Sequence, residues 1–309
     1  MVSEILIKGG LEKYFGKIYS IEKLKKGTSG NTFIIHAGKK YVFKTFEKKN
    51  KKSLETQIRQ LRKINEKNEI TINPVSSKVL GNDKFIGYAY EYFEGETYEN
   101  SSDKNKLYVL GKLAGTFNKQ AKPLTKPCKN NSIYKEVLKS YKENKEYFSK
   151  LPNSKEVIEI IDKELALLKG FDKKKFRSQI VHGDIHFQNI LYTNNKFRII
   201  DIDGLRERNV VFEPVTMLSF LLNYNNFEKN VKLFLKGYES EYKLLKEEKK
   251  AIPYFFLLRT MNEIIWFVYL LKKGFITLKQ YNEYVVKSIK RAKIVMKDFD
   301  NLIKFFSKI

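Results

Sequence analysis

Residues 182–189 read HGDIHFQN, and this polar stretch lies among short apolar runs at 180–181, 190–191 and 199–200. Short runs of β-favouring residues separated by polar turns predict three short strands. The half of the chain that contains them is otherwise largely helical in its spacing of apolar residues. We therefore expect a loop held rigidly between strands, which is where catalytic side chains are commonly positioned.

Three oxygen-bearing side chains of this segment have the spacing that phosphoryl transfer from ATP requires. The reaction needs one group that orients the attacking hydroxyl, and hard oxygen ligands that hold Mg²⁺. Asp184 suits the first task, while Asn189 and then Asp201 offer oxygen ligands for the metal. The order D-x-x-x-x-N followed by D is that of kinase active sites. The sequence thus predicts an ATP- and Mg²⁺-dependent phosphotransferase.

HGDIHFQN, followed by IIDIDG at 199–204, resembles the catalytic loop and metal-binding motif of the aminoglycoside phosphotransferase and choline kinase-like superfamily. Its members are similar in fold to protein kinases, so the resemblance implies an α+β fold with two lobes. It implies a small N-terminal antiparallel sheet with one helix, and a larger, mainly helical C-terminal lobe. By the same resemblance Asp184 is the catalytic base, Asn189 and Asp201 are the Mg²⁺ ligands, and His182 is a structural residue of the loop.

The upstream parts of an ATP site follow in the order that kinases use. A glycine-containing turn between the first two strands would bring backbone N–H groups to the phosphates, although the same glycines would also suit a simple hairpin. Lys44 matches the strand lysine that neutralises phosphate oxygens, and Glu55 matches its ion-pair partner on the next helix. YAYEYFEG at 88–95 resembles the hinge that contacts adenine. The predicted cofactor-binding residues are Gly27, Ser29, Gly30, Asn31, Lys44, Glu55, Glu91, Tyr92 and Phe93.

The predicted lobes are residues 1–93, with the ATP-binding sheet and helix, and residues 94–309, with the catalytic loop, the metal site and the acceptor-binding helices. In the first lobe, β-type runs are expected at 18–46, 78–80 and 85–93, with a helix at 49–67. In the second, helices are expected at 104–120, 132–148, 154–168 and from 215 to the end. Pro152 and Pro253 are expected near helix starts, with Ser154 as an N-cap.

Two positions depart from the family pattern near the catalytic loop. Asn118 stands where many relatives carry a histidine at the end of a helix. The stretch 214–218 reads PVTML and lacks the aspartate that supports the loop from behind in relatives, so the neighbouring Glu213 is a candidate replacement. His186 is expected to support Asp184, and Asp203 matches a second acid whose role varies in the family.

The net charge of +25 comes from 60 Lys and Arg against 35 Asp and Glu, which are scattered along the sequence. With no recognisable nucleic-acid module, we expect attraction of polyanions such as ATP and no specific nucleic-acid partner. Cys128 is the only cysteine, which excludes a disulfide framework and fits a cytoplasmic location. The N-terminus lacks a secretory pattern, and the apolar run at 264–271 is too short to span a membrane, so it predicts a core helix.

Two other functions compete with catalytic phosphotransfer. GDIH at 183–186 resembles the opening of metallophosphoesterase motifs, but such two-metal enzymes need more histidine ligands than the three histidines of this chain allow. A non-catalytic protein of the same fold, similar to the spore-coat CotS-like branch, is the second alternative. The combined presence of Lys44, Asp184, Asn189 and Asp201 favours catalysis.

The acceptor is expected to be a hydroxyl of a small metabolite, an amino alcohol or a sugar, with an aminoglycoside as the alternative. The acidic residues Glu213, Glu239, Glu241 and Glu263 would suit a cationic acceptor, although acidic residues on solvated helix faces are far commoner. The positive charge of the chain ranks a small hydroxylated metabolite ahead of an aminoglycoside.

Overall fold

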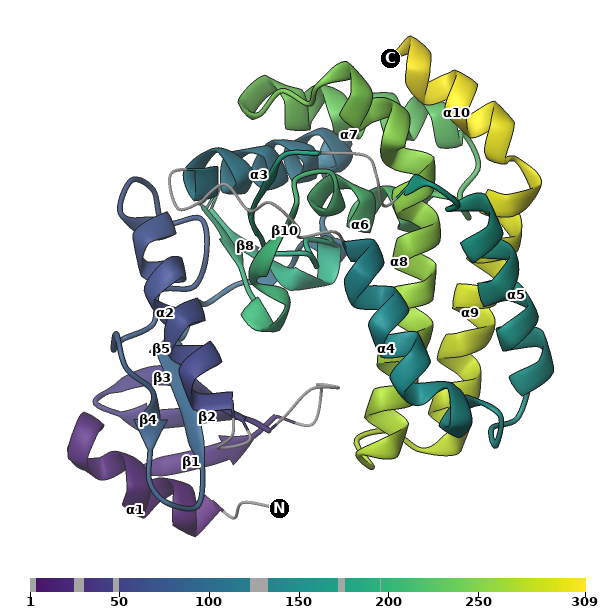
Figure 1. Ribbon diagram of the computed structural model, residues 1–309. Coiled ribbons are helices and arrows are strands. Elements are labelled where there is room, and N and C mark those ends of the chain that lie inside the picture. Colours follow the sequence, from purple (N-terminus) through teal and green to yellow (C-terminus); the bar gives the residue numbers. More distant parts are fainter. Residues whose placement is uncertain (1–3, 25–30, 47–49, 123–132, 172–175, 195) are drawn as a thin grey trace. The chain divides into compact units, whose positions relative to one another are not determined.

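The computed structural model describes residues 4–24, 31–46, 50–122, 133–171, 176–194 and 196–309. The chain divides into two compact units, one of Met1–Ser101 with Phe187–Asp203 and one of Ser102–His186 with Gly204–Ile309. The first contains a small antiparallel sheet and the second is mainly helical (Figure 1). This division differs from the boundary predicted between residues 93 and 94, because the segment after the catalytic loop pairs with the N-terminal part.

The main sheet of the first unit has five strands in the order β1-β2-β3-β5-β4, and all neighbours are antiparallel. Its strands are β1 (Ser20–Lys23), β2 (Thr32–Ala37), β3 (Lys39–Phe46), β4 (Leu80–Gly81) and β5 (Ile86–Glu91). Gly38 joins β2 to β3 with a φ of +75°, a conformation that glycine adopts without steric cost. The glycine-broken β runs therefore form antiparallel strands, as the sequence predicts.

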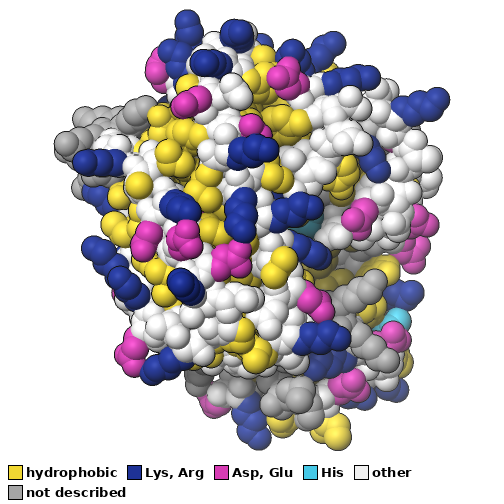
Figure 2. All heavy atoms as spheres, turned by 90° about the vertical axis from the view of Figure 1, so that its right-hand side faces the viewer, with side chains coloured by type: hydrophobic (Ala, Val, Ile, Leu, Met, Phe, Trp, Pro, Cys, Tyr) yellow, Lys and Arg dark blue, Asp and Glu magenta, His cyan; other side chains and the backbone are white. Residues whose placement is uncertain are grey.

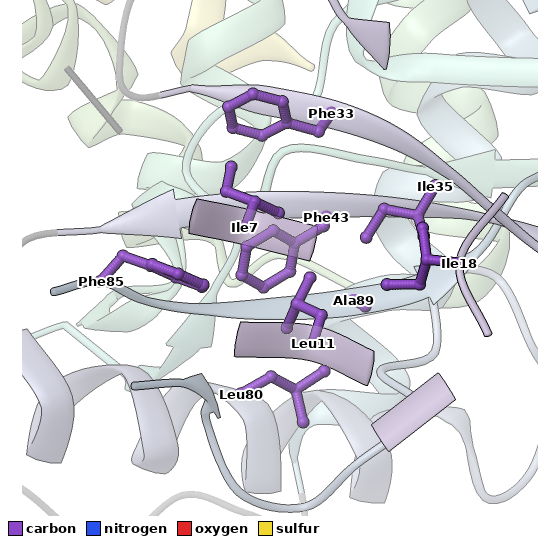
Figure 3. Packing of buried hydrophobic residues seen from close by; sticks show 9 residues of the cluster. All are labelled: Ile7, Leu11, Ile18, Phe33, Ile35, Phe43, Leu80, Phe85 and Ala89. Carbon is purple, nitrogen blue, oxygen red and sulfur yellow. The ribbon is translucent and has the colours of Figure 1, made fainter. Parts of the chain in front are cut away.

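Helix α1 (Glu4–Phe15), which the sequence analysis does not predict, covers one face of this sheet. Its Ile7 and Leu11 are fully buried against apolar side chains of β2, β3, β4 and β5 (Figure 3). Two adjacent glycines weaken the helical signal of its sequence, because glycine is a poor helix former. Gly10 is nevertheless needed, since a Cβ atom there would collide with the ring of Phe85.

The opposite face of the sheet carries Lys44. Side chains alternate between the two faces of a strand, and Phe43 points into the core beneath α1, so Lys44 points the other way. Tyr88 pairs with Lys44 across β3 and β5, and its ring stacks on those of Phe46 and Tyr90 at centroid distances of 5.6 and 6.1 Å. Aromatic rings therefore surround the stem of the lysine.

Helix α2 (Lys51–Asn65) anchors the segment that holds the metal-binding motif. It buries Leu54, Ile58, Leu61 and Ile64 along one face, as the predicted helical spacing requires. Asn65 at its end donates a hydrogen bond of 2.9 Å to the carbonyl of Ile72 and accepts one from the hydroxyl of Thr71. The chain at 70–72 is thereby fixed to the helix.

A second sheet of the first unit continues this connection to the motif. It comprises β6 (Glu96–Thr97), β8 (Ile190–Thr193) and β9 (Lys196–Ile199) in the order β6-β8-β9. Ile199 exchanges backbone hydrogen bonds with Ile70 and Ile72, at 2.8 and 3.0 Å. Because Ile199 lies only two residues before Asp201, these bonds fix the position of the Asp201 backbone within the first unit.

The second unit consists of helices around one pair of short strands. The strands β7 (Ser178–Val181) and β10 (Arg206–Asn209) are antiparallel, and β7 ends immediately before His182. The helices are α3 (Lys106–Ala121), α4 (Ile133–Phe148), α5 (Ser154–Leu167), α6 (Phe212–Leu221), α7 (Phe227–Glu241), α8 (Lys246–Lys272), α9 (Leu278–Lys297) and α10 (Phe299–Lys308). The helical turns η2 (Tyr98–Asn100) and η5 (Phe187–Asn189) belong to the first unit, and η6 (Ile202–Gly204) spans the division in sequence between Asp203 and Gly204.

One predicted helix start and one predicted N-cap are wrong. Pro253 lies inside α8, because the helix begins earlier, where the backbone N–H of Leu245 donates to the carboxylate of Glu248 at 2.9 Å. The N-cap of α5 is Asn153, which adopts a φ of +61°, and not Ser154. Asparagine tolerates this left-handed conformation better than most residues.

Among the described residues, α8 is the one helix that is long and apolar enough to cross a bilayer. Of its most apolar 18-residue stretch, 61% is buried inside the protein. Core helices of globular proteins have the same length and composition. On the molecular surface, Figure 2 shows lysine and arginine side chains spread among acidic, neutral and hydrophobic ones. The basic residues on this face are thus distributed rather than gathered into one stripe.

Helices α3 and α7 approach each other so closely that glycine is required at their contact. A Cβ atom on Gly111 would collide with the carbonyl oxygen of Phe234, and one on Gly237 with that of Tyr108. Backbone atoms cannot turn aside as a flexible side chain can. The glycines therefore set the distance between these two helices.

We expect Gly237→Ala to lower the free energy of unfolding by about 1–3 kcal/mol, because the added methyl group forces the two helix backbones apart. Gly9→Ala is the matched control, since Gly9 lies in α1 with open space at its Cβ position. That change should be neutral or stabilise by about 0.5–1 kcal/mol through helix propensity. Urea unfolding measures both, and equal stabilities for the two variants would contradict the contact.

Candidate active site

Lys44 forms the centre of a charged cluster in the first unit. Its ammonium lies 2.8 Å from an oxygen of Asp201 and 2.8 Å from an oxygen of Asp203. The lysine side chain is only 10% exposed, whereas those of the aspartates are 38% and 21% exposed. The cluster therefore presents its carboxylates outward and keeps its cation inside.

The lysine of this cluster is held in its charged form. Burial by itself would lower the pKa of Lys44, but the negative charges and hydrogen bonds of Asp203 and Asp201 raise it above its usual range. The pKa of Tyr88 and that of Tyr90 are raised as well, first by burial and further by the two carboxylates. Lys44 is thus a permanent cation beside neutral phenol groups, with two carboxylates as counterions.

The backbone at Asp201 adopts an uncommon conformation. Its φ is +64°, in the left-handed region that few residues other than glycine enter, although aspartate and asparagine tolerate it best. Such conformations persist where the surrounding structure fixes them, and they are frequent at functional sites. Ile200, the residue before it, donates to the carbonyl of Asn189 at 2.9 Å, which ties the two predicted metal ligands to adjoining backbone.

The donors of this cluster suit Mg²⁺, which prefers hard oxygen ligands and is commonly held by one or two carboxylates together with phosphate oxygens. Asp201 and Asn189 offer a carboxylate and an amide oxygen. Within the described part of the chain, no group of three or more His, Cys, Asp or Glu side chains could hold a metal alone. A carboxylate and an amide oxygen are ligands that fit a metal also bound by phosphate oxygens.

Some of the predicted nucleotide-binding residues are described by the structure and others are not. Gly27, Ser29 and Gly30 lie outside the described residues. Asn31 is described, and its carbonyl accepts from the backbone N–H of Thr45 at 2.9 Å, beside Lys44. The expected ion pair between Lys44 and Glu55 is absent from the contacts of the described residues, because Asp201 and Asp203 take its place.

The predicted hinge at 88–95 begins inside β5 and continues beyond the end of that strand. Glu91 is the last residue of that strand, and its carboxylate pairs with Lys39 at 2.8 Å. The backbone N–H of Tyr92 donates to the carbonyl of Lys40 at 2.9 Å. The guanidinium of Arg198 lies 5.3 Å from the centroid of the Phe93 ring. These contacts fix the chain at the end of the sheet.

The catalytic loop begins in the second unit, where β7 passes into Gly183. This glycine has a φ of +73°, which turns the chain sharply after His182. His182 is fully buried and its ring meets that of Phe117 edge to face at 5.8 Å, as expected for a structural residue. Asp184, two residues after His182, keeps 36% of its side chain exposed.

Two side chains contact the two carboxylate oxygens of Asp184. The guanidinium of Arg259 in α8 is 3.1 Å from Oδ1, and Nε2 of His186 is 3.5 Å from Oδ2. Burial by itself would raise the pKa of Asp184, but the hydrogen bond from His186 and the charge of Arg259 hold it well below the usual range. The contact of His186 agrees with the supporting role that the sequence predicts for it. Arg259 is not among the residues that the sequence predicts for the site. No local motif distinguishes that arginine from the many other basic residues of the chain.

Glu213 supports the loop from within the second unit. One of its carboxylate oxygens accepts the backbone N–H groups of His182 and Gly183, at 2.6 and 3.1 Å. The side chain is almost completely buried at the start of α6. It therefore occupies the supporting position that the missing aspartate of 214–218 leaves open. Burial raises the pKa of Glu213 to about 7, although the two N–H donors oppose this effect.

The other acidic residues considered for a cationic acceptor have partners within the second unit. Glu239 pairs with Lys249, and Glu241 pairs with Lys112 and Lys119. Glu263 lies between two arginines of the helical unit. Asn118, at the position of the family histidine, donates to the hydroxyl of Tyr238 and is fully buried. A structural role explains each of these contacts.

Glu213→Gln is expected to remove part of the pH dependence of stability. The folded protein keeps the Glu213 proton up to a pH of about 7, whereas an unfolded chain releases it near 4.5. The folded state therefore binds the extra proton between these values, so the stabilising contribution is present below pH 4.5 and is lost as the pH rises through about 7.

Glutamine keeps an oxygen for the two N–H groups and has no proton to release. Relative to the wild type, the variant should gain on the order of 1–3 kcal/mol in free energy of unfolding between about pH 5 and pH 8. Urea unfolding across this range measures the difference. Parallel pH profiles for the two proteins would show that Glu213 does not titrate as described.

Comparison with known proteins supports the kinase-like features. Residues 20–250 match the Phosphotransferase enzyme family. No curated protein sequence matches the chain. Similar solved structures include an amicoumacin kinase in complex with AMP-PNP, Ca²⁺ and Ami, with a TM-score of 0.73 and 16% identity over 94% of this chain and 93% of that one. Choline kinase LicA from Streptococcus pneumoniae has a TM-score of 0.72 and 17% identity, covering 96% of this chain and 99% of that one.

The aminoglycoside phosphotransferase APH(4)-Ia is also similar, with a TM-score of 0.66 and 12% identity over 96% of this chain and 99% of that chain. At such identities the likeness shows the fold, which is protein-kinase-like, with a small N-terminal antiparallel sheet and a mainly helical C-terminal part. The expected fold class is therefore confirmed. Because the family match extends over most of the chain and the fold agrees with it, this protein belongs to the Phosphotransferase enzyme family.

Proposed function

We propose that this protein transfers the γ-phosphate of ATP, in the presence of Mg²⁺, to a hydroxyl group of a small molecule. The observation that carries the proposal is the ammonium of Lys44, which lies 2.8 Å from both Asp201 and Asp203. A cation buried beside outward-facing carboxylates is an arrangement suited to phosphate oxygens and a divalent metal. Similar structures were solved with AMP-PNP and Ca²⁺, and with ADP, which supports a nucleotide and a divalent cation here.

In this mechanism the first unit binds the donor. Lys44 donates to the phosphate oxygens, which reduces the repulsion that an incoming nucleophile meets. Asp201 and Asn189 are the residues that would hold Mg²⁺, which when bound neutralises charge that develops on the phosphates. The hinge at Glu91, Tyr92 and Phe93 would contact adenine mainly through its backbone.

The second unit supplies the group that acts on the acceptor. Asp184 accepts a hydrogen bond from the acceptor hydroxyl and orients its oxygen toward phosphorus. Its low pKa makes it a weak proton acceptor. A weak proton acceptor is compatible with phosphoryl transfer, because the transition state of this reaction is loose. The bond from phosphorus to the leaving group weakens before the acceptor hydroxyl has to lose its proton. Orientation is therefore the main contribution of Asp184.

The acceptor class is proposed from the chain and from similar proteins. Similar structures include a choline kinase, an aminopropanol kinase and a spectinomycin phosphotransferase. Glu213, Glu239, Glu241 and Glu263 are all engaged by protein groups, so they do not favour a polycationic acceptor. We therefore rank a small hydroxylated metabolite or amino alcohol ahead of an aminoglycoside, and place the reaction in the cytoplasm.

An acceptor screen tests this proposal. Purified protein with ATP and Mg²⁺ is offered hydroxylated amines, amino alcohols, sugars and aminoglycosides, and ADP release is measured. We expect one class to stimulate ADP release and Mg²⁺–ATP to raise the melting temperature by ligand linkage. A protein that neither binds ATP nor releases ADP with any acceptor would be a non-catalytic member of the fold.

Two variants should separate the two tasks. Asp184→Asn is expected to lower kcat by about 10²–10⁴-fold with little change in the ATP-induced thermal shift, because it removes the acceptor-orienting carboxylate. Lys44→Met is expected to raise KM for ATP and weaken the thermal shift, because it removes the phosphate-binding cation. Steady-state kinetics and thermal unfolding give both readouts. Wild-type turnover by the Asp184 variant would exclude that residue as the catalytic base.

A further inference from the structure

A closed ring of side chains in the second unit joins one carboxylate oxygen of Asp184 to the other. We infer that Arg259, together with the ring that holds it, is a positioning residue that fixes the orientation of the Asp184 carboxylate for the acceptor hydroxyl. The inference rests on the proposed function, since it specifies how the base of that reaction is held. Arg259 itself is not placed on substrate or phosphate.

The first link of the ring is the planar guanidinium of Arg259. One of its nitrogens is 3.1 Å from Oδ1 of Asp184, and another donates to the carbonyl of Gly183 at 3.3 Å. Its Nε donates to Glu263, one turn further along α8, at 2.9 Å. Three contacts in different directions leave the guanidinium little freedom to rotate. An arginine fork provides such directional contacts, and a lysine does not.

The second link holds Glu263 in turn. Its other carboxylate oxygen accepts from the guanidinium of Arg291 in α9 and from the hydroxyl of Ser288 at 3.0 Å. Arg259, Glu263 and Arg291 are all buried residues. Buried charges are stable only when each has well-placed partners, so the position of Arg259 depends on both helices.

The last link returns to the catalytic loop through aromatic contacts. The guanidinium of Arg291 lies 5.3 Å from the ring centroid of Phe220 in α6, within the range of a cation–π contact. The ring of Phe220 lies 5.3 Å from that of His186, and His186 reaches Oδ2 of Asp184 at 3.5 Å. Helices α6, α8 and α9 therefore act on the same carboxylate from its two ends.

Exposure within the ring distinguishes this arrangement from an ordinary structural ion pair. The side chain of Arg259 is 11% exposed, whereas that of Asp184 is 36% exposed. The ring therefore holds the carboxylate from the buried side and leaves its outer side accessible. Asp184 is the one acid in the loop, it is partly exposed to solvent, and it is the proposed catalytic base. An ion pair that only stabilised the fold would not need to include this residue.

The test uses the full-length protein and two measurements that need no identified acceptor. The first is the titration of Asp184 by NMR of protein labelled with ¹³C at the aspartate carboxyl carbons, assigned with Asp184→Asn. The second is ADP release from Mg²⁺–ATP with water as the phosphate acceptor. Arg259→Gln is expected to raise the pKa of Asp184 by at least about one, because a nearby positive charge is lost. It should lower kcat by about 10–100-fold with an unchanged KM for ATP, because the base is misoriented.

Arg177→Gln is the matched control. Arg177 makes a two-pronged ion pair with the buried Glu248, at 2.8 and 2.6 Å, in the same unit but outside the ring. Both glutamine variants remove the arginine partner of a buried glutamate, Glu263 or Glu248, and should melt at lower temperature. Only Arg259→Gln should change the titration of Asp184 and kcat. Arg259→Lys keeps the charge, so the pKa of Asp184 should return most of the way to the wild-type value and kcat should be intermediate between those of the wild type and Arg259→Gln. This variant replaces Arg259→Gln if the glutamine variant does not fold.

An Asp184 titration and a kcat in Arg259→Gln that match those of Arg177→Gln would overturn the inference. Failure of the proposed function has a different signature, since the wild type would then release no more ADP than Asp184→Asn. In that case the carboxyl titration still decides whether Arg259 controls the charge of Asp184.

Discussion

The burial of one ammonium group, that of Lys44, is the constraint on which the first unit depends. A buried cation is stable only if counterions reach it, and here these come from a segment 157 residues further along the chain. That segment is fixed by hydrogen bonds from Ile199 to the chain at 70–72, which Asn65 of α2 holds in place. Asp201 places its carboxylate 2.8 Å from the ammonium of Lys44 from a left-handed backbone conformation. The charge of Lys44 in β3 is thus paired with carboxylates of the predicted metal-binding motif, and hydrogen bonds connect that motif to α2.

The second unit solves the opposite problem, which is to keep a carboxylate charged while part of it remains accessible. Asp184 receives positive charge from Arg259 and a hydrogen bond from His186. The loop backbone beneath it is held by Glu213, whose own buried position raises its pKa. Each unit therefore contains an electrostatic cluster that is satisfied by residues of the same unit. In the proposed function, binding of the donor and orientation of the acceptor fall to these two separately stabilised clusters.

The sequence predicts most of the fold, because its elements depend on local patterns. Glycine-broken β runs form β2 and β3, and apolar spacing gives α2, α3 and α4 within a few residues. It also names Lys44 and Asp201 as site residues, and the structure brings these two side chains within 2.8 Å of each other, although the sequence predicts Glu55 as the partner of Lys44. It misses α1, whose Gly10 is explained only by the nearby ring of Phe85. It also misses Arg259, because a contact across 75 residues leaves no local signature among so many basic residues. The replacement of Glu55 by Asp203 as a partner of Lys44 likewise depends on tertiary packing.

The buried position of Lys44 has a consequence for how ionic strength affects nucleotide binding. Most of the +25 net charge belongs to lysines spread over the surface, as Figure 2 illustrates for one face. Mobile ions screen such exposed charges beyond about 8 Å at physiological salt, so their attraction for a polyphosphate fades as salt is added. Mobile ions have little access to a lysine that is 10% exposed. Added salt should therefore slow the encounter with the nucleotide while leaving the final grip on its phosphates largely intact.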